Sequence, residues 1–142
     1  MKKVVSMFLI CLGFLVACNA TGSESAETNG DSVKLKVYYF HNAHRCMTCN
    51  AIEKNTKETL ETYFKKEVEA GEIQMVVLNA EEKQNRDLVN KYEIWGSSLV
   101  LVKFVDGKED VESLTEFAFA NARQNSEKFK SGLKEKIKEK LQ

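Results

Sequence analysis

Two cysteines spaced three positions apart, Cys46 and Cys49, are the residues of this chain best placed to do chemistry. They follow an apolar run, Val37 to Phe40, and open an amphipathic segment that extends to Ala70. This pattern predicts a strand followed by a helix, with Cys46 at the exposed helix N-terminus and Cys49 about one turn further in. Unpaired N–H groups and the positive end of the helix dipole favour the thiolate form of Cys46. We therefore expect a reactive thiol with a second thiol within reach.

Cationic and titratable side chains stand next to the pair in the sequence. Arg45 adds a fixed positive charge beside Cys46, His44 adds a titratable side chain, and His41 is a second imidazole nearby. His44, Cys46 and Cys49 also offer the mixed nitrogen and sulfur ligands that suit Cu(I) or Zn²⁺. A third interpretation is a purely structural disulfide, although closing so short a loop restricts few unfolded conformations. Thiol–disulfide exchange is the first interpretation, and metal binding is the alternative.

The other two cysteines lie in an N-terminal segment that is typical of an export signal. An uncharged run from Val4 to Val16 follows a basic start and is too short to span a bilayer comfortably as a helix. The segment ends in Leu15-Val16-Ala17-Cys18, which resembles the bacterial lipobox. The resemblance implies a signal peptide of residues 1–17, a lipid on Cys18 and loss of Cys11. An uncleaved anchor or an ordinary signal peptide with a free Cys18 are the alternatives.

The mature chain is then expected at the cell envelope of a bacterium, on the periplasmic or surface side. The lipid on Cys18 would hold it to a membrane. Residues 19–32 consist of small and polar side chains without an aromatic residue, so residues 18–32 are predicted to be a flexible tether. Residues 33–142 are long enough to form one domain with its own core.

Composition narrows the possible partners. The 21 basic and 21 acidic side chains balance, and removing Lys2 and Lys3 with the signal peptide leaves 19 against 21, a net charge of −2. Without a basic excess, no nucleic acid is expected as a partner. The sequence has no Gly-rich phosphate loop and no nucleotide fingerprint, so we expect no cofactor beyond the cysteine pair. The expected partner is a protein thiol or disulfide of the envelope. The protein itself is expected to be a monomer.

Hydrophobic periodicity predicts alternating strands and helices. The predicted strands cover residues 33–40, 73–78, 99–105 and 108–113, and Asp106-Gly107 predicts a hairpin between the last two. The predicted helices cover residues 46–70, stopped by Gly71, then 81–93, then a short helix from Leu114 and a longer one capped by Asn125 or Ser126.

This order of elements, with Cys46-Met47-Thr48-Cys49 opening the first helix, resembles the thioredoxin fold over about residues 33–142. The resemblance implies an α/β fold whose four-stranded mixed sheet, built as βαβ and then ββα, is flanked by helices. The lipobox, the run from His44 to Cys49 and the run from Leu114 to Arg123 are similar to bacterial envelope lipoproteins catalogued as nitrophenyl compound nitroreductase subunits of the ArsF type. By position, Cys46 would attack a partner disulfide, and Cys49 would resolve the mixed disulfide.

Two positions depart from the thioredoxin pattern. The buried Asp six residues before the first cysteine is Phe40 here, which leaves His41 or His44 as the nearest proton acceptors. The cis-proline that faces the cysteines is matched by Ser98, and we expect the bond before it to be trans, because a cis bond before a non-proline residue costs about 2.5–4 kcal/mol. Trp95, close to this position, either forms part of a substrate groove or packs in the core.

Overall fold

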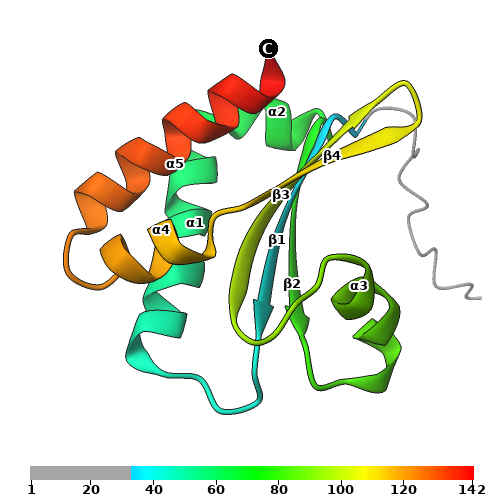
Figure 1. Cartoon of the computed structure of the whole chain (residues 1–142). Coiled ribbons are helices and arrows are strands. Elements are labelled where there is room, and N and C mark those ends of the chain that lie inside the picture. Colours follow the sequence, from blue (N-terminus) through cyan, green and yellow to red (C-terminus); the bar gives the residue numbers. More distant parts are fainter. Residues whose placement is uncertain (1–32) are drawn as a thin grey trace, which may run out of the picture.

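The computed structural model describes residues 33–142, in which one sheet carries helices on both faces (Figure 1). The predicted signal peptide and tether lie outside the described residues. The elements in chain order are β1 (Leu35–His41), α1 (Met47–Tyr63), α2 (Lys65–Glu69), β2 (Ile73–Asn79), a 3-10 turn (Lys83–Asn85), α3 (Arg86–Lys91), β3 (Ser98–Val105), β4 (Lys108–Ser113), α4 (Thr115–Asn121) and α5 (Ser126–Leu141).

The four strands form a mixed sheet in the order β2-β1-β3-β4. Strand β1 pairs parallel with β2 and antiparallel with β3, and β3 pairs antiparallel with β4. This is the βαβ-then-ββα arrangement of the thioredoxin fold, so the predicted fold class is confirmed. Because β1 is an inner strand, its side chains from Val37 to Phe40 are buried on both faces of the sheet. The end of this rigid strand leads directly into the loop before Cys46.

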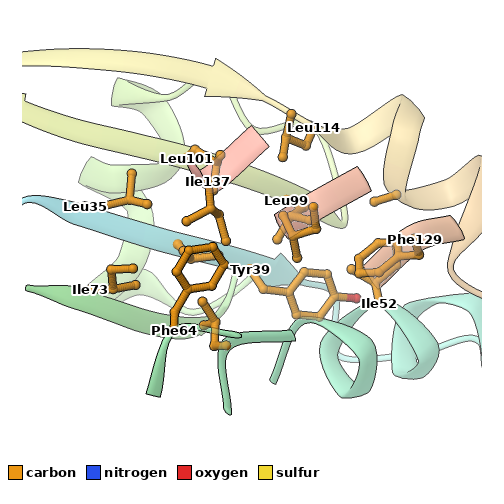
Figure 2. Close-up of a cluster of buried hydrophobic side chains, with 14 of the residues drawn as sticks. Leu35, Tyr39, Ile52, Phe64, Ile73, Leu99, Leu101, Leu114, Phe129 and Ile137 are labelled. Atoms are coloured by element: carbon orange, nitrogen blue, oxygen red, sulfur yellow. The ribbon is translucent and has the colours of Figure 1, made fainter. Parts of the chain in front are cut away.

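Two separate cores hold the sheet between its helices. Helices α1, α4 and α5 cover one face, and their apolar side chains pack on those of β1 and β3 (Figure 2). The second core, on the opposite face, joins strand side chains to those of α3 and the loop that follows it. Alternate residues of β1 therefore enter different cores: Tyr39 faces α1, and Tyr38 and Phe40 face α3.

The predicted single helix over residues 46–70 is interrupted at Phe64, whose backbone leaves the helical region (φ −131°, ψ 24°). This break lets the Phe64 ring pack into the core. On either side of the break, Tyr63 at the end of α1 and Val68 on α2 are exposed. Gly71 ends α2 with a positive φ of 75°, as predicted.

The predicted helix over residues 81–93 is shorter in the structure. Its first residues form the 3-10 turn before α3 begins. The Asn79 side chain accepts a hydrogen bond from the backbone N–H of Glu81 at 3.0 Å, and the Asn85 side chain donates to the Asn79 carbonyl at 2.8 Å. These side-chain contacts favour a turn at the end of β2 and delay the helix start.

The predictions for the last third of the domain are confirmed. Asp106 and Gly107 both have positive φ, as a tight hairpin turn between β3 and β4 requires. Asn125 caps α5, because its side chain accepts a hydrogen bond from the N–H of Lys128 at 3.0 Å. Within residues 33–142, none of the helices has the length and apolar character needed to cross a membrane.

Candidate active site

The Cys46–Cys49 pair lies where the loop after β1 enters helix α1, and a disulfide joins the two residues. Their Cα atoms are 5.0 Å apart, a separation that disulfides commonly bridge. Cys46 is the N-cap of α1, and its sulfur accepts a hydrogen bond from the Cys49 N–H at 3.1 Å. Cys46 is exposed, whereas Cys49 is only 5% exposed. The predicted arrangement, one accessible sulfur at the helix start and one further in, is confirmed.

The surroundings of Cys46 favour a negative charge on its sulfur once the disulfide is reduced. The first turn of α1 contains no acidic residue. The positive end of a 17-residue helix therefore acts on Cys46 with no carboxylate in that first turn to oppose it. Met47, the next residue, is 67% exposed, so the surface beside the sulfur is apolar and open to a partner.

The Arg45 side chain contacts Tyr39 and Glu53. Its guanidinium carbon lies 5.7 Å from the centre of the Tyr39 ring. The same guanidinium donates a hydrogen bond to Glu53, which also receives one from Lys57. Partial burial disfavours the charged form of Arg45, but the pairing with Glu53 outweighs this and raises the Arg45 pKa. The fixed positive charge expected beside Cys46 is present, and the Glu53 carboxylate pairs with it.

Tyr39 is a site residue that the sequence did not reveal, because an aromatic residue in an apolar strand is read as core. It is fully buried, and its hydroxyl donates a hydrogen bond to the Cys49 carbonyl oxygen at 2.8 Å. Burial raises the Tyr39 pKa, and the nearby Arg45 and Ser97 side chains offset this only in part. Phe40, which takes the place of the thioredoxin Asp, packs in the core on the α3 face. The polar group from β1 that contacts the start of α1 is therefore the hydroxyl of Tyr39, the residue before Phe40.

A serine hydroxyl approaches the buried sulfur, and it belongs to Ser97. The Ser97 Oγ lies 3.7 Å from the Cys49 Sγ. The Ser98 hydroxyl instead donates to the Gly96 carbonyl at 3.2 Å. Strand β3 begins at Ser98, opposite Phe40 of β1, so the residue that reaches the cysteines is the last one of the preceding loop. The bond before Ser98 is trans, as expected.

The two histidines occupy different environments. His41 ends β1, is half-buried, and has its ring centre 6.2 Å from that of Tyr39. Its Nδ1 lies 3.1 Å from the Asn42 carbonyl oxygen. His44 is exposed on the loop before Arg45. No hydrogen bond joins either imidazole to a cysteine in the described part of the chain, so their part in proton transfer stays a prediction.

The alternative metal set does not assemble in the structure. Among residues 33–142, no three His, Cys, Asp or Glu side chains gather in an arrangement that could hold a metal ion. Of the three residues proposed as ligands, Cys46 and Cys49 are instead bonded to each other through their sulfurs. The redox group described by the structure is a part of the polypeptide itself.

Trp95 lies on the surface and not in the core, because 97% of it is exposed. It lines a shallow hollow of about 320 Å³ at the end of α3, together with Val89, Asn90, Glu93 and Ile94. The core alternative for Trp95 is therefore wrong. Trp95 lies two residues before Ser97 in the sequence, and its place in a substrate groove stays a prediction.

No family model and no curated protein matches the chain. Solved structures that resemble it include the thioredoxin of Fasciola hepatica, with 21% identity over 77% of this chain and 83% of that one, at a TM-score of 0.47. Another, described as a malarial protein, has 14% identity over 61% of this chain and 93% of that one, at a TM-score of 0.39. The strand order of the sheet, with a cysteine pair at the start of α1, gives this chain a thioredoxin-like fold.

Proposed function

We propose that this protein is a thiol–disulfide oxidoreductase whose Cys46–Cys49 pair alternates between dithiol and disulfide. One observation carries the proposal: an exposed sulfur at the N-cap of α1 is bonded to a buried sulfur one helical turn later. The exposed sulfur is open to a partner disulfide. The buried sulfur is held where it meets Cys46, so it acts on whatever Cys46 has captured.

The reaction transfers two electrons from the dithiol to a partner disulfide. The Cys46 thiolate attacks one sulfur of the partner, a mixed disulfide forms, and the second partner sulfur leaves as a thiolate that takes up a proton. Cys49 then loses its proton and attacks the Cys46 sulfur. The Cys46–Cys49 bond forms, the mixed disulfide breaks, and the remaining partner sulfur leaves and takes up that proton.

The membrane anchor is part of the same proposal and rests on the sequence alone. The run Leu15-Val16-Ala17-Cys18 supports cleavage before Cys18 and attachment of lipid to its sulfur. Two or more acyl chains would hold the domain at a membrane of a bacterial envelope, with residues 18–32 as the tether. The domain would then work as a monomer on envelope proteins.

The partner is proposed to be a protein that exchanges thiols and disulfides in the envelope. Similarity to the ArsF-type nitroreductase subunits favours a role in passing electrons to an associated reductase, and keeping another envelope protein reduced is the other form of the same chemistry. The reduction potential of the Cys46–Cys49 pair separates an electron donor from an oxidant of other proteins. Thioredoxin, a donor, has a potential of about −270 mV, and a strong periplasmic oxidant has one of about −120 mV. Equilibration of the chain with dithiothreitol and glutathione buffers measures this potential.

The exchange proposal is tested with the purified full-length chain. Reduced protein is mixed with insulin, whose interchain disulfides are the probe, and free insulin chains are measured by mass spectrometry. We expect the wild type to cleave insulin and to become oxidised at Cys46 and Cys49. The Cys49→Ser variant should accumulate an insulin adduct on Cys46 that dithiothreitol removes. The double variant Cys46→Ser/Cys49→Ser keeps Cys11 and Cys18 and is therefore the control for exchange by other thiols. Exchange by the wild type that does not exceed that of this control contradicts the proposal.

The anchor is tested by expressing the full chain in a bacterium and separating membranes from soluble protein. The wild type should be found with the membranes, and mass spectrometry should show an acylated Cys18 as the first residue. The Cys18→Ser variant should lose the acyl mass. An N-terminus cut at another position without lipid would refute the anchor but leave the exchange chemistry intact.

A further inference from the structure

Two hydroxyl groups contact Cys49, one at its main chain and one at its sulfur. The Tyr39 hydroxyl binds its main-chain carbonyl at 2.8 Å, and the Ser97 hydroxyl lies 3.7 Å from its sulfur. Tyr39 comes from β1 and Ser97 from the loop that enters β3, and these strands are paired in the sheet. The neighbouring strands therefore fix both the backbone of Cys49 and the hydroxyl that faces its sulfur.

The resolving step needs a negative charge on Cys49, and the position of this residue disfavours that charge. Cys49 is only 5% exposed, and burial in an apolar environment favours the neutral thiol over the thiolate. Phe40 cannot act as a proton acceptor and packs in the other core. Some other group near the sulfur must compensate for the lost hydration.

Neither Tyr39 nor Glu53 is suited to take the proton of Cys49. Because burial raises the Tyr39 pKa, its hydroxyl stays protonated near neutral pH and acts as a donor. The Glu53 carboxylate receives hydrogen bonds from Arg45 and Lys57, which lower its pKa and occupy its oxygens. Ser97 is the polar side chain in hydrogen-bond contact with the Cys49 sulfur among the described residues.

A hydroxyl at this place interacts very differently with the two states of Cys49. A disulfide sulfur is a weak hydrogen-bond acceptor, in keeping with the long distance of 3.7 Å. A thiolate is an anion, and hydrogen bonds to anions are shorter and roughly twice as strong. The contact therefore strengthens at the moment when Cys49 becomes the nucleophile.

We propose that Ser97 is a further catalytic residue, whose hydroxyl donates a hydrogen bond to the Cys49 thiolate while it attacks the mixed disulfide on Cys46. The role rests on the exchange function proposed above. As Cys49 loses its proton, the Ser97 O–H turns its hydrogen to the sulfur. When the Cys46–Cys49 bond forms, the charge moves to the leaving partner sulfur, which takes up the proton, and the Ser97 contact relaxes to its weak form.

The first test isolates Cys49 and does not depend on exchange activity. In the full-length Cys46→Ser chain, the rate of Cys49 alkylation by iodoacetamide is followed against pH by mass spectrometry of the peptide that carries it. Adding Ser97→Ala should move the midpoint of this profile upward by about one pH unit. Ser97→Thr keeps a hydroxyl and should restore the midpoint. Ser131→Ala, which removes an exposed hydroxyl bound to a carbonyl of α5, is the matched control.

The pH profile separates a chemical role of Ser97 from a structural one. If Ser97→Ala only loosened the fold, alkylation would become faster at every pH and its midpoint would move downward, because greater exposure of Cys49 favours the thiolate. That result, or an unchanged profile, overturns the proposal. Urea unfolding of the same variants shows independently whether the substitution has changed stability.

The second test uses the chain with both cysteines and a glutathione mixed disulfide formed on Cys46. Its decay to the Cys46–Cys49 disulfide should be about three- to fourfold slower in Ser97→Ala at neutral pH, because the thiolate is scarcer but more nucleophilic, and normal in Ser97→Thr. Equal decay in the wild type and Ser97→Ala overturns the role of Ser97 while exchange itself stands. A wild type that fails to cleave insulin, with the pH shift at Cys49 still present, refutes the proposed function and leaves the Ser97–Cys49 interaction in place.

Discussion

The Arg45 guanidinium donates a hydrogen bond to the Glu53 carboxylate, which ties the residue before the disulfide to the second turn of α1. Lys57 binds the other carboxylate oxygen from one turn further along the helix. Two cations thus share one largely buried carboxylate next to the redox pair. The Arg45–Glu53 ion pair positions the loop that carries Cys46 and also reduces the net positive charge beside the Cys46 sulfur.

Replacing Glu53 by Gln should change how stability depends on pH. Burial alone would raise the Glu53 pKa, but hydrogen bonds from Lys57 and Arg45 outweigh it, and the pKa is lowered. A carboxylate with a lowered pKa in the folded state contributes stability above its ordinary pKa and loses it as pH falls toward the lower value. The wild type should therefore lose unfolding free energy more steeply than Glu53→Gln as the pH falls below about 4.5.

Urea unfolding of the oxidised full-length chain at a series of pH values measures this difference. Glu69→Gln is the matched control, because Glu69 forms an exposed pair with Lys65 on α2 and its side chain is 66% exposed, against 16% for Glu53. This control should follow the wild-type curve. Parallel curves for the wild type and Glu53→Gln would show that the carboxylate is not held by its two cations.

The same substitution should make the Cys46 thiol more reactive. With Glu53 neutral, the charge of Arg45 is no longer shared, and a nearby positive charge favours the thiolate. We expect alkylation of Cys46 at pH 7 to be about two- to fivefold faster in reduced Glu53→Gln, as for other partly exposed charge interactions of up to about 1 kcal/mol. Timed iodoacetamide labelling followed by mass spectrometry gives the rate, and a slower reaction would argue against this electrostatic account.

Replacing Tyr39 by Phe should lower stability without disturbing packing. The ring and its cation–π contact with Arg45 are kept, but the hydroxyl is lost, and with it the hydrogen bond to the Cys49 carbonyl and the contacts of the hydroxyl with Arg45 and Ser97. A loss of about 1–2 kcal/mol in unfolding free energy is expected. Tyr63→Phe removes the hydroxyl of an exposed residue at the end of α1 and should cost little. Equal stability of the two variants in urea would show that the Tyr39 hydrogen bond contributes nothing net.

Replacing Gly132 by Ala should destabilise the domain although Ala favours helices. Gly132 lies inside α5, where Ala would normally gain about 1 kcal/mol. A Cβ at this position would come within 2.7 Å of the Phe117 ring, which is stacked on Phe129 in the core. Overpacking of this kind costs about 1–3 kcal/mol, so the net change is a loss. A thermal melt above the wild-type midpoint would show that the ring moves aside without cost.

Local patterns in the sequence determined most of the fold. The apolar run before Cys46, the Asp106-Gly107 hairpin and the Asn125 cap each act through neighbours a few residues away, and the structure confirms all three. The position of the disulfide at the helix start follows from the same local signals. Spacing alone was therefore enough to place the exposed and the buried sulfur.

The tertiary structure decided which other groups surround the sulfurs. Ser97 meets Cys49 across 48 positions of sequence, and which of two adjacent serines does so depends on the residue at which β3 begins. Because side chains alternate along β1, Tyr39 faces α1 and Phe40 faces the other side of the sheet. Arg45, whose charge was expected to act on Cys46, is paired with Glu53. Strand register and side-chain pairing arise only when the sheet and helices pack, so sequence spacing does not reveal them.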